Sequence, residues 1–518
     1  MRILVAETLA EEGLALLRAS HQVDVRVGLA RDALLAVLPD YDALLVRSQV
    51  QVDAEAIAAG KRLVVIGRAG VGVDNIDLTA ATKAGITVVN APTGNTVAAA
   101  EHTLALLFAL SRRVAAADAS MRRGEWKRSA FTGRELRGKV LGIVGLGKIG
   151  LTVADRARAM EMELLGHDPY VTEEGAAHHG VRLVPLPELL ERSDAVTVHV
   201  PLTRTTRDLI GAAELARMKP DALLINVARG GVIDEAALAE ALTGGRLGGA
   251  AVDVFSSEPP TGSALLDAPN TVLTPHLGAS TEEAQTRVAV EAVQQVLEVL
   301  AGRPARYALN APLLTPETAQ ALAPYLPLAR MLGQFYAQFA PNLEGLTLDV
   351  AGELAAYDAS PLVAAVLGGL LENVSEERVN LINASSVARA HGISLIERKS
   401  PEAVRYASML SLTGSSSVSG TVAGSEPRLV GLADYWVDMP PASHMLVTRH
   451  HDRPGTMGRI GLMLGEADVN ISAMHLARMG PRADALMILA LDDAVPAGIA
   501  EQIRDHEAVL DLWLIRLD

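Results

Sequence analysis

Cysteine is absent from this chain of 518 residues. Its absence excludes disulfide bonds, thiolate nucleophiles, zinc sites built on cysteine and iron–sulfur clusters. The sequence also lacks any HExxH or EF-hand pattern, and we therefore predict no metal site. A chain without cysteine fits a reducing compartment, so we expect the protein to be cytoplasmic.

The chain also has fewer basic than acidic residues. The chain has 46 Lys and Arg residues against 61 Asp and Glu residues, which gives a formal net charge of -15. Surfaces that bind nucleic acids or anionic membranes need clustered lysine and arginine, so we predict neither kind of partner. A local basic pocket is compatible with this composition.

The chain lacks the sequence features of a membrane or secreted protein. Its most apolar helical window, residues 97–110, contains Glu101 and His102. That window is shorter than the roughly 20 residues that a membrane span needs, and we predict a buried or interface helix there. The first residues, MRILVAE, are typical of a strand and not of a secretory signal.

Aromatic residues make up only 3% of the chain, whereas 49% of its residues are hydrophobic. The cores must therefore be built mainly from Ala, Leu and Val, which suits helices packed on parallel strands. A chain of this length exceeds the size at which one core keeps growing, so we expect several domains.

Strand-like and helical segments alternate through the first part of the chain. The alternation runs through residues 1–96, starts again over residues 97–282, and ends with an amphipathic helix over residues 283–302. Such a βαβ rhythm is typical of open, mostly parallel sheets with right-handed crossovers. The predicted fold class is therefore α/β, with two doubly wound Rossmann-like domains.

The remaining residues predict two smaller domains. Residues 305–443 have weaker periodicity, and we expect an α/β domain whose topology stays open. The tract LTGSSSVSGTVAG in this region fits either a flexible linker or two strands joined by a tight turn. Residues 444–518 follow the order β-α-β-β-α-β, which is that of a ferredoxin-like module.

The segment LGIVGLGKIG carries a glycine-rich motif. It follows a predicted strand and opens a predicted helix, which is the context in which GxGxxG binds a dinucleotide. Gly145 permits the tight turn, Gly147 lets the backbone approach a pyrophosphate, and Gly150 allows close packing of helix on strand. The predicted cofactor-binding loop consists of Gly145, Gly147, Lys148, Ile149 and Gly150.

The next predicted strand ends in an acidic residue, Asp168, about 20 residues beyond the motif. A carboxylate there hydrogen-bonds the ribose hydroxyls and repels a 2′-phosphate, so Asp168 favours NAD over NADP as the cofactor. The alternative is that Asp168 only begins the turn HDP.

Polar residues follow three later predicted strands, at the sheet edge where α/β domains bind ligands. His276 offers a base that titrates near neutral pH, Glu258 can orient its ring, and Arg229 offers a fork that matches a planar carboxylate. Hydride exchange between NAD and a hydroxy acid needs these three groups. Their structural alternatives are a surface histidine, a turn residue and a helix cap. The same loops supply two further predicted cofactor contacts, Asp253 and Gly278.

The segments GLGKIG, HDP, NVARGGVIDE, DVFSSEPP and TPHLGAST together resemble the D-2-hydroxyacid dehydrogenases, over at least residues 1–300. The resemblance implies a substrate-binding domain of residues 1–96 and 283–304, into which an NAD-binding domain of residues 97–282 is inserted. It also implies a homo-oligomer, a dimer or a tetramer, with the helix of residues 97–110 as a contact element. The residues that match the family's catalytic positions are Arg229, Glu258 and His276.

Four further segments, LLVRS, GRAGVGVDNID, PTGNTVAAAEH and GEWKRSAFTG, resemble the 3-phosphoglycerate dehydrogenase branch of that family. The reaction implied is the NAD-dependent oxidation of D-3-phosphoglycerate to 3-phosphohydroxypyruvate, the first step of L-serine biosynthesis. A phosphorylated substrate needs cations beyond the one that holds its carboxylate. The candidate substrate-binding residues are Arg47, Arg68, Gly70, Val71, Asn95, Lys127 and Arg128.

Three alternatives stay open at this point. Lys127 and Arg128 fit ordinary surface charge as well as a phosphate site. Reduction of hydroxypyruvate or glyoxylate is the runner-up activity on the same scaffold. A NAD-sensing binding protein without enzymatic activity is the alternative from another functional class.

The C-terminal residues resemble the intervening and ACT regulatory domains of the long enzymes in this branch, over residues 305–443 and 444–518. The segment HHDRPGTMGRIGLMLGEADVNISAMHL carries the resemblance. Related modules bind an amino acid at positions that match Asp452 and Asn470, and L-serine is the effector implied. His450 stands where some relatives have a tyrosine, so a purely structural module is the alternative. The predicted effector residues are His450, Asp452 and Asn470.

Overall fold

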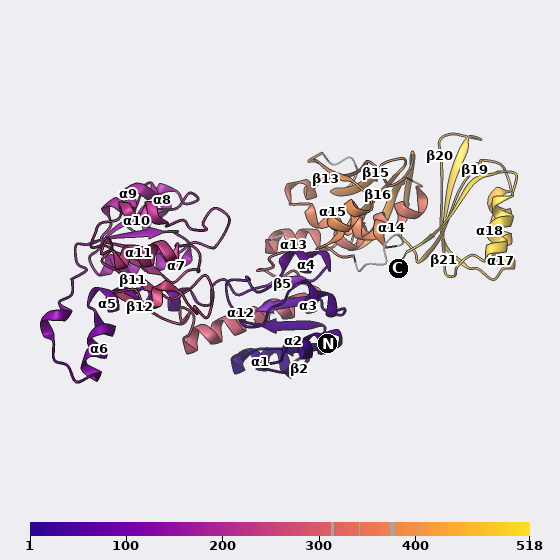
Figure 1. Cartoon of the computed structure of the whole chain (residues 1–518). Helices are drawn as coiled ribbons and strands as arrows, with labels where there is room; N and C mark the ends of the chain where they lie inside the picture. Colours follow the sequence, from indigo (N-terminus) through magenta and orange to yellow (C-terminus); the bar gives the residue numbers. More distant parts are fainter. Residues whose placement is uncertain (312–314, 341, 373–378, 403–404, 518) are drawn as a thin grey trace.

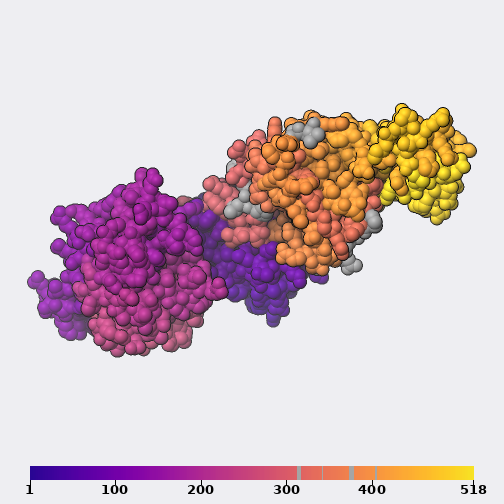
Figure 2. Space-filling view, turned by 90° about the horizontal axis from the view of Figure 1, so that it is seen from above, coloured from indigo at the N-terminus to yellow at the C-terminus, as the bar shows by residue number. Residues whose placement is uncertain are grey.

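The computed structural model describes residues 1–311, 315–340, 342–372, 379–402 and 405–517. Four sheets follow one another along an elongated molecule (Figures 1 and 2). The seven-stranded sheet lies at one end and the C-terminal sheet at the other, with the N-terminal sheet and the six-stranded sheet between them. Among the helices of the described ranges, none has the length and apolar character needed to cross a bilayer.

The N-terminal sheet is parallel throughout, in the order β2-β1-β3-β4-β5. Its strands are β1 (Arg2–Val5), β2 (Gln22–Val25), β3 (Ala43–Val46), β4 (Val65–Arg68) and β5 (Thr87–Val89). The helices between them are α1 (Glu11–Arg18), α2 (Arg31–Val37), η1 (Leu38–Asp40), α3 (Ala54–Ala59) and α4 (Leu78–Lys83). The central strands are buried, as expected for a parallel sheet with helices on both faces.

A helix from much later in the chain completes this unit. Helix α12 (Glu282–Leu300) packs on α1 and β4, and its Val293 and Val296 are fully buried in the same core as Ile3. A Cβ on Gly67 in β4 would lie 2.5 Å from the Cγ2 of Val296, so glycine permits this close approach. The chain therefore leaves the N-terminal unit after β5 and returns to it at α12.

The second sheet has seven parallel strands in the order β12-β11-β10-β9-β6-β7-β8. Its strands are β6 (Val140–Val144), β7 (Glu163–His167), β8 (Val181–Leu183), β9 (Ala195–Val198), β10 (Leu223–Asn226), β11 (Gly249–Val252) and β12 (Thr271–Leu273). Its helices are α5 (Thr96–Ser111), α6 (Val114–Arg122), η2 (Arg128–Phe131), α7 (Lys148–Ala159), α8 (Glu173–His178), α9 (Leu186–Arg192), α10 (Ala212–Arg217), α11 (Glu235–Thr243) and η3 (Ala264–Leu266). The chain runs outward from β6 to β8 and then returns to β9 on the other side of β6, so the order of strands reverses there. The carboxyl ends of β6 and β9 flank the crevice in which such sheets bind ligands.

The third sheet is mixed, in the order β14-β13-β15-β16-β17-β18. Its strands are β13 (Leu346–Gly352), β14 (Leu395–Ser400), β15 (Ser408–Thr413), β16 (Ser417–Ala423), β17 (Glu426–Leu432) and β18 (Tyr435–Met439). Its helices are α13 (Pro316–Leu322), α14 (Tyr325–Phe339), η4 (Glu353–Ala356), α15 (Ser360–Leu371) and α16 (Ala384–Ala390). The Ser- and Gly-rich tract forms the end of β15, the tight turn after it and β16, and is not a linker.

The fourth sheet is antiparallel, in the order β20-β21-β19-β22. Its elements are β19 (His444–His451), α17 (Thr456–Glu466), β20 (Ile471–Arg478), β21 (Asp484–Leu491), α18 (Ala497–Arg504) and β22 (Val509–Arg516). They follow the predicted order β-α-β-β-α-β. The predicted fold class is thus confirmed for the two parallel sheets and for this module.

Side-chain contacts connect the third sheet to the fourth sheet and to the N-terminal unit. Phe339 of α14 packs on Trp513 of β22 with ring centroids 4.7 Å apart, inside one core shared by the third and fourth sheets. The third unit also contacts the N-terminal unit, because the Nδ2 of Asn380 donates to the carbonyl of Gly85 over 2.6 Å. Gly85 follows α4, in the turn that leads to β5.

Candidate active site

The glycine-rich loop lies at the carboxyl end of β6, where the order of strands reverses. Gly145 has a φ of 94°, and a Cβ there would lie 2.5 Å from the carbonyl oxygen of His199. A Cβ on Gly150 would come within 2.1 Å of the carbonyl oxygen of Gly145. Gly147 is the N-cap of α7, and nothing lies within 4 Å of the position of its Cβ. The first and third glycines therefore permit close packing, and the second leaves the loop open to a ligand.

The amino end of α7 suits a pyrophosphate. No side chain caps this helix, which lies wholly within the described residues, and its first turn contains no acidic residue. That turn begins with the exposed Lys148 and the half-buried Ile149. Free N–H groups and the positive end of the helix dipole favour an anion at such a position. The residues present thus fit a dinucleotide cofactor.

Asp168 lies beside this loop, directly after β7. Its Oδ2 accepts a hydrogen bond from the N–H of Leu146 over 2.8 Å, and its Oδ1 accepts one from the N–H of Tyr170 over 2.8 Å. The carboxylate is therefore next to the predicted pyrophosphate site and also closes the turn that follows the strand. Both interpretations of Asp168 are compatible with this placement.

His276 and Glu258 form a pair at the carboxyl edge of the same sheet. His276 follows β12 with a φ of 55°, and its Nδ1 lies 2.8 Å from the Oε2 of Glu258. The other carboxylate oxygen, Oε1, accepts the N–H of Phe255 over 3.1 Å. The two side chains are 45% and 39% exposed, so a ligand can reach the pair. A carboxylate on Nδ1 fixes the ring and leaves Nε2 to exchange a proton.

The loops that carry Arg229, Glu258 and His276 pack against one another. A Cβ on Gly230 would lie 1.9 Å from the carbonyl oxygen of Phe255, in the loop before Glu258. A Cβ on Gly278 would lie 2.9 Å from the Cγ1 of Val227, in the loop before Arg229. The structure thus brings the three predicted catalytic residues to one edge of the sheet.

Asp253 lies beneath the histidine loop with a fully buried side chain. Its Oδ1 accepts hydrogen bonds from Thr274 Oγ1 over 2.6 Å and from the N–H of Leu277 over 2.7 Å, and its Oδ2 accepts the N–H of Gly278 over 2.9 Å. Burial by itself raises the pKa of this carboxyl, but the hydrogen bonds that it accepts hold its pKa below the ordinary value. The ionised carboxylate therefore organises the loop from inside the protein.

A second histidine belongs to this group and was not among the predicted site residues. The Nε2 of His102, in α5, lies 3.1 Å from Asp253 Oδ1 and 3.2 Å from Thr274 Oγ1. Thr274 donates its hydroxyl proton to Asp253, and an ionised carboxylate only accepts, so the Nε2 of His102 carries a proton. The signal in the sequence was a histidine inside an otherwise apolar helix.

Three arginines converge where the two parallel sheets face each other. The Nε of Arg229 lies 3.3 Å from the Oδ2 of Asp74, an ion pair that joins the seven-stranded unit to the N-terminal unit. Burial, together with the positive charges of Arg229 and Arg47, lowers the pKa of Arg68 to about 10. The buried Nε of Arg68 has no hydrogen-bond partner within the described ranges. An anion here would relieve both the repulsion and the unpaired donor.

The loop after β4 is shaped around these arginines. A Cβ on Gly70 would lie 2.4 Å from the Nη1 of Arg68, and a Cβ on Gly72 would lie 2.2 Å from the Nη2 of Arg229. Glycine at both positions therefore lets the guanidinium groups approach the backbone of this loop.

Two further predicted substrate residues, Val71 and Asn95, lie at the edges of this region. The carbonyl of Val71 accepts a hydrogen bond from Asn90 Nδ2 over 2.6 Å, which holds the loop in place. Asn95 precedes α5, where the chain crosses between the two parallel sheets, and its buried Oδ1 has no partner in the part of the chain that the structure describes.

Lys127 and Arg128 are not brought to this region within one chain. They lie on an arm formed by α6 and η2, which projects from the seven-stranded unit on the side away from the N-terminal sheet (Figure 1). Both side chains are exposed, and the Nζ of Lys127 lies 3.2 Å from the Oε1 of Glu125.

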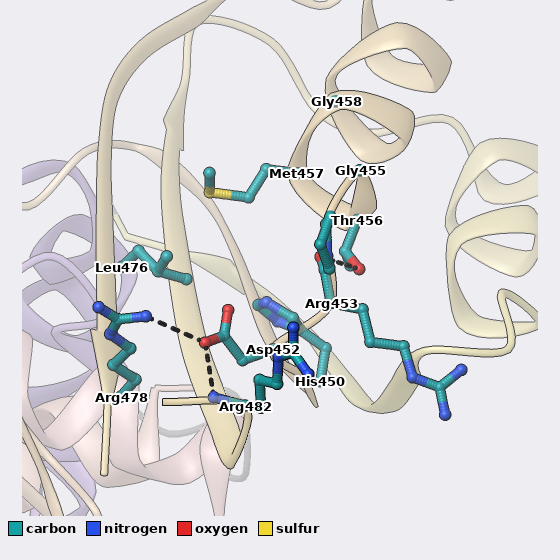
Figure 3. Close-up of a pocket in the computed structure, with 11 residues that line it drawn as sticks. His450, Asp452, Arg453, Gly455, Thr456, Met457, Gly458, Leu476, Arg478 and Arg482 are labelled. Carbon is teal, nitrogen blue, oxygen red and sulfur yellow. Dashed lines mark hydrogen bonds and ion pairs between the residues drawn. The ribbon is translucent and has the colours of Figure 1, made fainter. Parts of the chain in front are cut away.

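The C-terminal unit has a cavity of its own, of about 330 Å³ (Figure 3). His450 and Asp452 line it, together with the amino end of α17. Asn470 lies at the opposite end of β20, where its Nδ2 donates to the Oδ2 of Asp492 over 2.6 Å. Within one chain, His450 and Asp452 therefore line the cavity, whereas Asn470 lies at the end of β20 that is away from it.

Comparisons with known proteins match both halves of the chain. Residues 104–278 match the family described as D-isomer specific 2-hydroxyacid dehydrogenase, NAD binding domain, and residues 321–433 match the D-3-phosphoglycerate dehydrogenase intervening domain. The D-3-phosphoglycerate dehydrogenase of Synechocystis is 44% identical over 100% of this chain and 95% of its own. That of Archaeoglobus fulgidus is 40% identical, with 100% of each chain covered. A solved glyoxylate reductase from Paecilomyes thermophila is 30% identical, with a TM-score of 0.55 over 60% of this chain and 98% of its own.

We expect His102→Leu to loosen the loop of residues 274–278, because the buried Asp253 then loses a hydrogen bond. A hydrogen bond to a charged group contributes about 1.5–3 kcal/mol, so backbone amides at Leu277 and Gly278 should exchange with solvent at least about tenfold faster. Hydrogen exchange of the peptide that covers this loop, followed by mass spectrometry, measures the effect. His102→Gln is the matched control, because it keeps a donor and should exchange near the wild-type rate. Equal exchange in the two variants would contradict the role of this bond.

Proposed function

The chain belongs to the D-3-phosphoglycerate dehydrogenase family, and on this premise we propose that it oxidises D-3-phosphoglycerate to 3-phosphohydroxypyruvate with NAD. The catalytic residues in this proposal are Arg229, Glu258 and His276. The protein is a nicotinamide-dependent dehydrogenase that acts on a small molecule. The observation that carries the proposal is the packing of the loop of Arg229, which belongs to a group of arginines, against the loop of Glu258, which pairs with His276.

His276 is the base of this reaction. Its Nε2 takes the proton of the C2 hydroxyl as the carbonyl forms, while its Nδ1–H donates to the Oε2 of Glu258. Glu258 keeps the ring in this orientation and faces the positive charge that the ring gains. A nicotinamide cofactor held by the glycine-rich loop and the amino end of α7 would supply the acceptor for the hydride of C2. Asp253 positions the loop from below and takes no proton.

The arginines hold the two acidic ends of the substrate. Arg229 now pairs with Asp74, whose side chain is 71% exposed, and the substrate carboxylate can take the place of that solvated partner. Arg47 and Arg68 remain for the phosphate, with the neutral groups of Gly70, Val71 and Asn95 around them. The repulsion within this arginine group supports the assignment, because a dianion offsets it.

Asp168 selects NAD over NADP. Its carboxylate lies next to the backbone of Leu146 in the glycine-rich loop, where a 2′-phosphate on the ribose would bring like charges together. The glycine-rich loop and the amino end of α7, with Lys148 and Ile149, hold the pyrophosphate.

The protein assembles as a homo-oligomer through the arm. Large apolar side chains are exposed over α5, α6 and the segment that follows them, and Trp126 has 77% of its surface exposed. A second copy covering them would also bring Lys127 and Arg128 next to another subunit, which is the way these two cations would reach a substrate. The exposed apolar residues are Phe108, Val114, Met121 and Trp126.

This reaction is the first step of L-serine biosynthesis. The C-terminal cavity is the site of an amino acid effector, and L-serine is the simplest candidate. His450 and Asp452 line that cavity, which supports an effector role over a purely structural one. Asn470 would join them only from a second copy of the chain, because it lies at the far end of β20. A cytoplasmic location remains a prediction from composition.

We expect D-3-phosphoglycerate to give NADH far more efficiently than D-glycerate does. Two charge-assisted hydrogen bonds to the phosphate correspond to roughly 100-fold or more in kcat/KM, measured by absorbance at 340 nm. In Arg68→Gln the ratio should fall by at least about tenfold. Equal kcat/KM for the two substrates would favour the hydroxypyruvate or glyoxylate reductase alternative, and no NADH from either would favour a binding protein.

His276→Gln should lower kcat for phosphoglycerate oxidation by about 10²- to 10⁴-fold, because glutamine takes no proton from the C2 hydroxyl. NADH binding, followed by the fluorescence of the cofactor, should stay within about twofold of wild type. A variant that loses both to the same extent would remove His276 from the chemistry.

Asp168→Asn removes the charge of this residue, and its amide keeps an oxygen that can accept the N–H of Leu146, while the N–H of Tyr170 loses its acceptor. The ratio of kcat/KM for NAD to that for NADP should fall by about tenfold or more, since the repulsion of the 2′-phosphate is lost. Asp168→Ala should relax the choice similarly and also weaken NAD binding. An unchanged ratio in Asp168→Asn would contradict the selective role of the carboxylate.

A further inference from the structure

The C-terminal cavity carries more positive charge than a plain amino acid requires. Arg478 and Arg482 line it, against the single carboxylate of Asp452 (Figure 3). The side chain of Arg453 leads away from the cavity and lies 3.9 Å from Glu507. L-Serine has no net charge at neutral pH, so its binding would leave this excess in place. The question for this site is which ligand would balance it.

Asp452 offers one free oxygen to a ligand. Its Oδ2 accepts hydrogen bonds from the Nη1 of Arg478 over 3.1 Å and from the N–H of Arg482 over 3.2 Å. Its Oδ1 has no partner among the described residues, and Figure 3 shows it directed into the cavity, away from both arginines. A carboxylate oxygen of this kind suits an ammonium group.

His450 and the first turn of α17 offer the complementary groups. His450 is 1% exposed and lines the cavity; its Nδ1 lies 3.3 Å from Thr448 Oγ1, while its Nε2 has no partner within the described part of the chain. Burial lowers the pKa of His450, so its ring is neutral near pH 7 and can present an N–H there. Helix α17 has no side-chain cap and no acidic residue in its first turn. The N–H of Thr456 bonds to the carbonyl of Arg453, and Met457 and Gly458, which line the cavity, leave backbone N–H groups that are free, among the described residues, for a ligand. Such donors suit the carboxylate of an amino acid.

Two guanidinium groups then remain for a third group of the ligand. Arg478 contacts Asp452 through Nη1 alone, and the guanidinium of Arg482 has no ion-pair partner in the described ranges. Arginine forks match the oxygens of a phosphate, which carries about −1.5 to −2 charge at pH 7. Met457 and Leu476 supply the apolar wall between the two arginines and the helix end.

We propose that this cavity binds an amino acid whose side chain carries a phosphate. The ammonium meets the Oδ1 of Asp452, the carboxylate meets the amino end of α17 and His450, and the phosphate meets Arg478 and Arg482. The inference rests on the proposed effector role of the cavity and specifies the class of the effector. The proposed effector and the substrate D-3-phosphoglycerate both carry a carboxylate and a phosphate, but only the effector has an ammonium group. The carboxylate of Asp452 therefore distinguishes the ligand of the cavity from that of the substrate crevice.

Calorimetric titration of the full-length protein with O-phospho-L-serine and with L-serine tests the proposal. We expect the phosphorylated amino acid to bind at least about tenfold more tightly, as one charge-assisted hydrogen bond provides. In the double variant Arg478→Gln/Arg482→Gln the two affinities should agree within about threefold. The control Arg449→Gln/Arg504→Gln removes the same charge outside the cavity and should keep the preference. Circular dichroism verifies that each variant is folded.

Equal affinity of the wild type for the two ligands would overturn the proposal, as would a preference that survives in Arg478→Gln/Arg482→Gln. L-Aspartate distinguishes the acidic groups, and tighter binding of L-aspartate than of O-phospho-L-serine would overturn the choice of phosphate. If neither serine ligand binds, the effector role of the cavity falls as well. NADH formation from D-3-phosphoglycerate by the same preparation would then show that the proposed enzymatic reaction stands apart from this result.

Discussion

One buried carboxylate, that of Asp253, is the constraint on which the active site depends. A buried charge without partners costs several kcal/mol, so Asp253 is tolerable only when its donors are in place. Those donors come from α5 and from the end of β12 with the loop beyond it. Folding cannot satisfy this carboxylate without also setting the loop that carries His276. The same interaction therefore serves the stability of the seven-stranded unit and the position of His276.

The arginine group shows the opposite arrangement, in which folding assembles charges that repel one another. Arg47 and Arg229 both disfavour the charged form of Arg68, and glycines at 70 and 72 remove the side chains that would keep the guanidinium groups apart. Because folding already orders these arginine side chains, ligand binding loses little conformational entropy there. In the proposed reaction the anionic substrate would offset this repulsion, and its two acidic groups would each meet an arginine.

Local patterns in the sequence were sufficient for the nucleotide loop and for the strand ends. The helix expected directly after the glycine-rich motif is α7 (Lys148–Ala159), and the one expected over 283–302 is α12 (Glu282–Leu300). His102 was missed because its partner lies 151 residues away, and such a pairing leaves no local pattern. The placement of Asn470 opposite the cavity likewise depends on strand pairing. In residues 305–443 the composition of β16, rich in serine and glycine, fitted a linker as well as a strand, so local sequence left both alternatives open.

The core shared by α14 and the C-terminal sheet has a mechanical consequence. Because Phe339 and Trp513 belong to one packed interior, we expect the last two sheets to move as one rigid body. Through the hydrogen bond from Asn380 to the carbonyl of Gly85, these two sheets contact the N-terminal unit at the turn before β5. The strand that follows this turn leads toward Asn95 and the crossing into α5, the helix that carries His102. We expect a small rotation of the last two sheets to displace this turn and, through the strand that follows it, the segment that leads into α5.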